Sequence, residues 1–252
     1  ADTSFMQFGI GKLLQQFGLH DDALKMLDKS SKLFEKLNNL QSESGALTQM
    51  AGIYVTYGNL DEAMRLYQQS LEIEERLSDL KGKNATLHEM AYVYVIRGDL
   101  DEGMNLYQQS LELEERLGDL EGKSVTLNNM AEIHITRGNF DEAIWLCQQS
   151  LEIKDQQGNL LGKSKTLAMM ARIYFTSGDL EGAMKLYQQS LVIEEKMGDL
   201  QGKGVTLAWI AAIETARERE RERGERVRQR ERDTHTHTKR ERKKERKRER
   251  KK

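Results

Sequence analysis

Several side chains in this 252-residue sequence belong to types that act as nucleophiles or metal ligands in other proteins. Cys147 is the single cysteine, and a cysteine nucleophile needs a nearby base in an electropositive setting. His235 and His237 have a spacing that could hold zinc, but two ligands do not make a zinc site. Neither observation is enough to predict a catalytic nucleophile or a zinc site.

Glutamates form the other candidate cluster, because paired carboxylates can act as general acid and base. They occur in short runs at 72–75, 112–115 and 194–195. We interpret these runs, Glu114 included, as the solvated outer faces of helices. No segment assembles a nucleophile, a base and an oxyanion donor, so we expect no enzymatic activity, no catalytic residue, no cofactor and no bound metal.

The elements that hold these residues repeat every 40 positions. The string Tyr-Gln-Gln-Ser-Leu begins at residues 67, 107 and 187, and Cys-Gln-Gln-Ser-Leu begins at 147. The same period holds for Gly58, Gly98, Gly138 and Gly178, for Met50, Met90, Met130 and Met170, and for Leu47, Leu87, Leu127, Leu167 and Leu207. Such self-similarity is the signature of a stacked repeat architecture. Cys147 occupies the position that tyrosine takes in the other units, so we expect it to be a buried, inert thiol. His134 likewise replaces the tyrosine at the register of Tyr94 and Tyr174, and we expect it to be a partly buried histidine.

Each unit predicts two helices. In the best-preserved unit the first helix spans about 83–97, where Leu87, Met90, Ala91 and Tyr94 give the stripe of an amphipathic helix. It ends at Gly98, and Asp99 is expected to cap the second helix, which runs to about 117. We expect residues 118–123 to form the turn into the next unit. Small residues such as Ala91 and Gly103 allow the two helices to approach closely.

Composition agrees with an all-helical chain. There is no proline, the single cysteine excludes an internal disulfide, and no apolar run approaches the ~18 residues that span a membrane. The sequence starts at Ala1, so the native N-terminus is expected to be missing, and we expect a cytoplasmic monomer. Residues 1–213 carry 20 lysines and arginines against 31 aspartates and glutamates, whereas residues 214–252 carry 19 against 10.

The pattern Leu87-x2-Met90-Ala91-x2-Tyr94, followed by Gly103 and Tyr107, resembles the tetratricopeptide repeat. The family's proline is replaced by Glu75, Glu115, Asp155 and Glu195, so the second helix is expected to run about six residues longer. This is similar to the 40-residue class of bacterial multidomain proteins, kinesin light chains and polarity adaptors. The resemblance implies an all-α, right-handed superhelix (solenoid) of about five hairpins and a partial sixth. Its units lie near 3–42, 43–82, 83–122, 123–162, 163–202 and 203–213.

In this family the first helices line a concave groove that binds partner peptides or helices. By position the resemblance implies the groove residues Gln49, Val55, His88, Glu89, Tyr92, Asn128, Asn129, Glu132, Lys165, Met169 and Arg172. These residues vary most between the units, as expected of a recognition surface. Random sequence variation on a surface that binds nothing would give the same pattern. Asn129 leads the set, because its amide can both donate to and accept from a peptide bond.

Residues 214–252 form a charged low-complexity tail. Alternating Arg-Glu and the Thr-His run at 234–238 are what two adjacent dinucleotide microsatellites would encode, so we interpret the tail as read-through sequence. It lacks core-forming residues and is expected to be disordered or an extended helix, frayed to about 230 and ended by the Thr-His run. The last first helix, 203–213, is then expected to expose Trp209 or Ile210.

The sequence thus predicts a protein-interaction scaffold with a protein or peptide partner. One alternative is a structural or sensor fragment of a larger multidomain protein whose activity lies in missing sequence. Another is nucleic-acid association through the lysines and arginines at 239–252, for which no interleaved aromatic residues provide base stacking.

Overall fold

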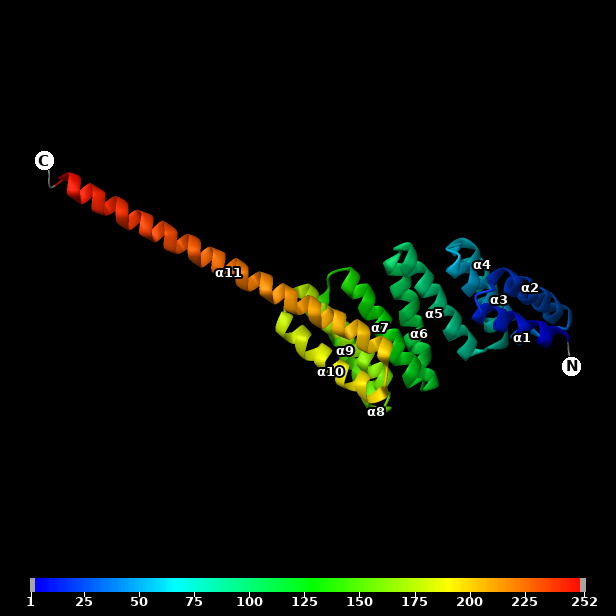
Figure 1. The fold of residues 1–252 in the computed structure, drawn as a ribbon. Helices are drawn as coiled ribbons and strands as arrows, with labels where there is room; N and C mark the ends of the chain where they lie inside the picture. Colours follow the sequence, from blue (N-terminus) through cyan, green and yellow to red (C-terminus); the bar gives the residue numbers. More distant parts are fainter. Residues whose placement is uncertain (1–2, 250–252) are drawn as a thin grey trace. The chain divides into compact units, whose positions relative to one another are not determined.

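The computed structural model describes the backbone of residues 3–249 and the side chains of residues 3–232. This part of the chain contains helices and turns and no strand, which confirms the all-α prediction (Figure 1). The helices are α1 (Thr3–Gln16), α2 (His20–Lys36), α3 (Leu40–Thr56), α4 (Leu60–Leu77), α5 (Leu80–Arg97), α6 (Leu100–Leu117), α7 (Leu120–Thr136), α8 (Phe140–Gln156), α9 (Leu160–Ser177), α10 (Leu180–Met197) and α11 (Leu200–Glu249).

The helices group into two compact units, Ala1–Gln157 and Gly158–Lys252. The first unit holds four hairpins, formed by α1 to α8 taken in consecutive pairs (Figure 1). The second unit holds the hairpin α9–α10 and the long helix α11. Over residues 3–249, five hairpins followed by one further helix are therefore confirmed.

The turns inside the hairpins fall where the glycine period predicts them. Gly98 follows α5 with φ of 90°, a left-handed conformation that glycine adopts without a steric penalty. Gly18, Gly58, Gly138 and Gly178 have the same sign of φ. Between hairpins, the non-glycine residues Asn38 and Ser78 take the left-handed position with φ of 53° and 54°. These two turns therefore carry backbone strain that the glycine turns lack.

Several predicted helix boundaries are wrong. The turn after α6 is only two residues long, because Asp119 accepts a 2.9 Å hydrogen bond from the Gly122 amide and starts α7 at once. Asp99 takes the capping position of α6 but makes no side-chain capping bond. Helix α6 ends at Leu117, which confirms the predicted end, but this is only two residues after Glu115, so the six-residue extension is not found there. The first helix α5 begins three residues earlier than predicted, at Leu80. Its earlier start accounts for part of the extra length of the 40-residue repeat.

The hairpin interiors follow the predicted stripes. Leu87, Met90 and Ala91 are buried on α5. Gly103 packs so close that a β-carbon there would lie 3.2 Å from the carbonyl oxygen of Ala91. The small residues therefore allow the close helix approach that the sequence predicts. Cys147 is buried and His134 is half-buried, which confirms both packing assignments.

Helix α11 differs most from the prediction, because it continues to Glu249 (Figure 1). The Thr-His run at 234–238 lies within it, so the expectation that this run ends the helix is wrong. Threonine and histidine are poor helix formers, but both keep the backbone N–H that proline lacks. The side chains of His235, His237 and the basic residues 239–252 lie outside the described residues.

The exposed residues of α11 also differ from the prediction. Trp209 is half-buried and stacks on Tyr187, with ring centroids 6.0 Å apart and planes 8° from parallel. It also meets Phe175 edge-on at 5.6 Å. Ile210 packs beside them, so the expectation that one of the two is exposed is wrong. Leu200, Val205 and Leu207 are exposed instead.

Candidate functional site

A group of polar and aromatic side chains on α4 to α7 brings together part of the predicted groove. It consists of Tyr67, His88, Glu89, Tyr107 and Asn129, and we call it the polar cluster. The Asn129 side-chain nitrogen lies 2.9 Å from Nε2 of His88, and the Tyr67 hydroxyl donates to Glu89 Oε2 at 3.5 Å. The His88 ring meets the Tyr107 ring edge-on at 5.1 Å. Residues 41 positions apart in sequence thus meet across neighbouring hairpins.

Burial sets the charge state of the polar cluster. It lowers the pKa of His88, which favours the neutral ring, and it raises the pKa of Tyr67 and Tyr107. The Glu89 side chain is exposed as a whole, yet partial removal of water from its carboxyl raises its pKa, against the opposing hydrogen bond from Tyr67. The polar cluster therefore offers neutral hydrogen-bonding groups beside one carboxylate, which suits recognition of polar ligand groups.

Tyr92 gives this region its apolar surface. It lies one turn after His88 on α5 and is 48% exposed. An exposed aromatic side chain next to half-buried polar groups is a typical composition for the anchor of an interface. The sequence-predicted residues that the structure brings together are accordingly His88, Glu89 and Asn129, with Tyr92 on the same helix face as His88.

The remaining predicted residues take other places. Gln49, Asn128 and Glu132 are half-buried on α3 and α7. Val55 is half-buried and packs against the hydrophobic cluster of Leu47, Ala51, Tyr67 and their neighbours. It occupies the register of Val95, which contacts Gly103 inside the next hairpin.

The last three predicted residues, Lys165, Met169 and Arg172, lie in the second compact unit, Gly158–Lys252. There Lys165 is exposed, and Met169 and Arg172 are half-buried. The positive charge of Arg172 acts on Tyr187, but burial dominates and raises the pKa of that tyrosine to about 12. Tyr187 in turn stacks on Trp209.

The contacts reveal a register that sequence analysis missed. In three places the residue 22 positions after a second-helix tyrosine interacts with that tyrosine: Glu89 with Tyr67, Asn129 with Tyr107, and Trp209 with Tyr187. These contacts join one hairpin to the next. The signal is present in the sequence, because the tyrosines and their partners both follow the 40-residue period.

Sequence analysis also misplaced three glutamates. Glu74, Glu114 and Glu194 are buried, so their assignment to solvated outer faces is wrong. Oε1 of Glu114 accepts from Thr126 Oγ1 at 2.8 Å and from Ser110 and Asn84 at 3.3 Å. Glu74 and Glu194 each accept from the equivalent serine and threonine. The helical register could have shown this, because Glu114 lies on the face of Gly103, Tyr107 and Ser110.

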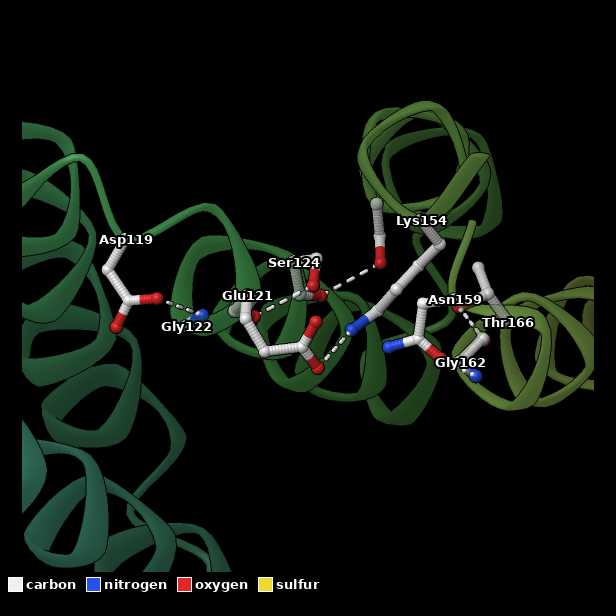
Figure 2. A network of polar contacts seen from close by, with 9 residues as sticks. Asp119, Glu121, Gly122, Ser124, Lys154, Asn159, Gly162 and Thr166 are labelled. Carbon is white, nitrogen blue, oxygen red and sulfur yellow. Dashed lines mark hydrogen bonds and ion pairs between the residues drawn. The ribbon is translucent and has the colours of Figure 1, made fainter. Parts of the chain in front are cut away.

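Lysine replaces glutamate at this register in α8. Lys154 is only 3% exposed, and its ammonium reaches back to Glu121 of α7 at 2.7 Å (Figure 2). Ser150 still donates to the Ser124 carbonyl at 2.8 Å, so the hairpin packing is unchanged. A buried lysine therefore replaces a buried glutamate here without changing the serine contact between the two helices.

Known proteins agree with this architecture. The family model described as Tetratricopeptide repeat matches residues 2–76, 83–156 and 123–193, which together make up more than half of the chain. A search of curated proteins found no significant match. In the part of the chain that the structure describes, no helix combines the length and apolarity needed to cross a membrane.

Three solved structures show the fold at low sequence identity. A putative kinesin light chain with nearly identical TPR-like repeats from Podosopora anserina is 21% identical with a TM-score of 0.66, covering 78% of this chain and 98% of that one. A signal transduction ATPase with a tetratricopeptide repeat sensor from Pyrococcus horikoshii is 16% identical with a TM-score of 0.73, covering 86% and 34%. The Rap conjugation gene regulator of plasmid pLS20, in complex with the Phr* peptide, is 14% identical with a TM-score of 0.67, covering 84% and 59%.

Proposed function

Since the chain belongs to the tetratricopeptide repeat family, we propose that it is a protein-interaction module that binds a peptide segment of a partner protein at the polar cluster. The observation that carries this proposal is the contrast between constant packing residues and variable residues on the first helices. Ala51, Ala91, Ala131 and Ala171 are all fully buried at one register. At the neighbouring register stand Gly52, Tyr92, Glu132 and Arg172. Packing does not require this variation.

The chemistry of the polar cluster favours an extended peptide. Half-buried amide and imidazole groups can hydrogen-bond to a ligand backbone, and such bonds fix its register. Tyr92 offers an aromatic surface to an apolar ligand side chain. Glu89 and the excess of acidic residues in 1–213 favour a segment that carries a basic residue.

A structural neighbour supports this mode of action. The Rap regulator of plasmid pLS20 was solved with a peptide bound, and its repeat fold resembles this chain over most of the present sequence. The likeness alone does not transfer a ligand, because one fold serves many functions. The proposal therefore rests on Tyr92, Glu89, His88 and Asn129, which substitutions can test.

Binding partners would be recovered with the full chain from a peptide library, and affinities measured by calorimetry. Tyr92→Ala should weaken binding by about 1–3 kcal/mol, the range for an aromatic anchor. Gln108→Ala, on the exposed side of α6, is the matched control and should bind as the parent does. If Tyr92→Ala and Asn129→Ala both leave every recovered interaction unchanged, the polar cluster is not the site. If deleting 214–252 abolishes binding, the tail is the interaction element.

A further inference from the structure

The first helices of the complete hairpins bury one face against the second helix that follows. Leu47, Leu87, Leu127 and Leu167 share one register on this face and are 8%, 3%, 2% and 3% exposed. The alanine one turn later in each helix is fully buried. In the first unit, Leu47 and Ala51 pack with Ala63, Leu66 and Tyr67 of α4. The same covered face thus recurs in α3, α5, α7 and α9.

Helix α11 carries this face without its cover. Leu207 occupies the leucine register but is 44% exposed, and Ala211 at the alanine register is exposed too. The other side of α11 is occupied, because Trp209 and Ile213 pack on α10. We call the uncovered surface, formed by Gly204, Leu207 and Ala211, the open face.

The covered faces also show a recurring hydrogen bond to a backbone carbonyl of the first helix. A serine of the second helix donates its hydroxyl to a first-helix carbonyl: Ser70 to Ser44 at 3.1 Å, Ser150 to Ser124 at 2.8 Å, and Ser190 to Ser164 at 3.0 Å. The equivalent residue of α11 is Gly204. It is exposed, and a β-carbon built there would meet no atom within 4 Å. Its carbonyl is therefore open to a serine hydroxyl from outside.

The following sequence does not supply the missing helix. Residues 214–252 contain only Ala216 and Val227 as apolar residues, and α11 continues through this region instead of turning back. Within the residues that the structure describes, no segment therefore covers the open face. The composition of a suitable cover follows from α4, α6, α8 and α10. Each carries a small residue, then an aromatic residue or cysteine four positions later, and a serine three positions after that.

We propose that the open face binds an amphipathic helix of a partner protein, antiparallel to α11, as a second helix supplied from outside. The small residue of the partner lies against Ala211, as Gly103 lies against Ala91, and its serine donates to the Gly204 carbonyl. This contact continues the hairpin interface of the chain itself, which is repeated in α9–α10 directly before it. It is independent of the peptide-binding role of the polar cluster.

The probe for this site is a synthetic peptide of residues 179–198, which contains the sequence of α10. A covalent staple between positions 185 and 189, both exposed on α10, keeps it helical, because free helices of this length are marginal in water. Titrated into the full 252-residue chain, it should bind at one site. Leu207→Glu should weaken this binding at least tenfold, and Ser190→Ala in the peptide should weaken it several-fold.

Val205→Glu is the matched control, because Val205 is exposed on an adjacent face of α11, where Val125 is also exposed at the same register. It should bind the stapled peptide as the parent does, and both variants should melt with the parent. Absence of saturable binding by the parent would overturn the proposal. So would equal affinity of the parent and Leu207→Glu, because a peptide that displaced the native α10 would not depend on Leu207.

Discussion

Replacing Glu114 with glutamine tests how a carboxyl group is held between two hairpins. Glu114 is 2% exposed, and its Oε1 accepts from Asn84, Ser110 and Thr126. Burial raises the pKa of this carboxyl above its usual 4.5, more than the three hydrogen bonds lower it, and Asp119 raises it further. Glutamine keeps an oxygen acceptor of the same shape and removes the charge.

The expected magnitude follows from these contacts. Glu114→Ala leaves the Thr126 hydroxyl and the Asn84 amide without their acceptor, whereas Ser110 retains Asn84 Oδ1 at 2.6 Å. An unsatisfied buried group costs about 1–3 kcal/mol, so with two such groups we expect alanine to reduce the free energy of unfolding by about 2–6 kcal/mol. Glutamine should change it by less than about 1 kcal/mol near neutral pH, because it keeps the acceptor.

The pH dependence has a defined sign. A raised folded pKa means that the folded chain holds the Glu114 proton more tightly than the unfolded chain. This stabilisation is fully present below the unfolded pKa and is lost as pH rises through the folded pKa. The Glu114→Gln variant has no carboxyl group here that could lose its proton. Its free energy of unfolding, compared with that of the parent, should therefore increase from acidic to neutral pH. The pKa of Glu74 is also raised, and this residue remains in the variant, so the dependence becomes weaker without vanishing.

Urea denaturation followed by far-UV circular dichroism, from pH 4.5 to 8, measures these differences. Hydrogen exchange of α6 and α7 localises them, because repeat arrays need not unfold in one step. Glu112→Gln is the control, since Glu112 is exposed on the same helix. Parallel pH curves for the parent and Glu114→Gln would refute the reasoning, as would a loss of stability in Glu114→Gln as large as in Glu114→Ala.

Three further predictions concern stability. Ser78→Gly should raise the free energy of unfolding by roughly 0.5–1 kcal/mol in urea melts, because Ser78 has φ of 54° and glycine removes the left-handed strain; Gly98→Ala should do the opposite. Asn129→Ala should lower it by about 1–2 kcal/mol, since His88 loses its hydrogen-bond partner, and unchanged thermal melting would show that this bond contributes nothing. Amide hydrogen exchange should be fastest in the first hairpin and in 203–213, where neighbours are fewest, and slowest in 83–160; uniform protection would contradict this.

The sequence by itself determined the hairpins and their turns. Gly98, Ala91 and Gly103 recur in kind every 40 residues, and each has a local reason to be small: a left-handed turn or a close approach of two helices. Helical periodicity likewise placed Leu87 and Met90 inside. These features depend on spacing along one chain segment, which a sequence displays directly.

Helix ends were less accessible to sequence reasoning. The start of α7 at Leu120 depends on the single hydrogen bond from the Gly122 amide to Asp119, and Asp99 shows that the same residue type can occupy the position without that bond. The continuation of α11 through 234–238 depends on the absence of a strong breaker, and poor helix formers alone do not stop a helix.

Only the tertiary structure decided which side chains of different units meet. Asn129 and His88 are 41 residues apart, and Glu114 is surrounded by residues of α5 and α7. A glutamate on an isolated helix is expected to be exposed to solvent, because burying its charge is costly. Glu114 lies inside because the next hairpin brings Thr126 to it and removes the water, and Leu207 is exposed because α11 continues to Glu249 instead of turning back. The register of α6 places Glu114 on the inner face of its helix, but its partners Asn84 and Thr126 come from neighbouring helices, which its own segment does not specify.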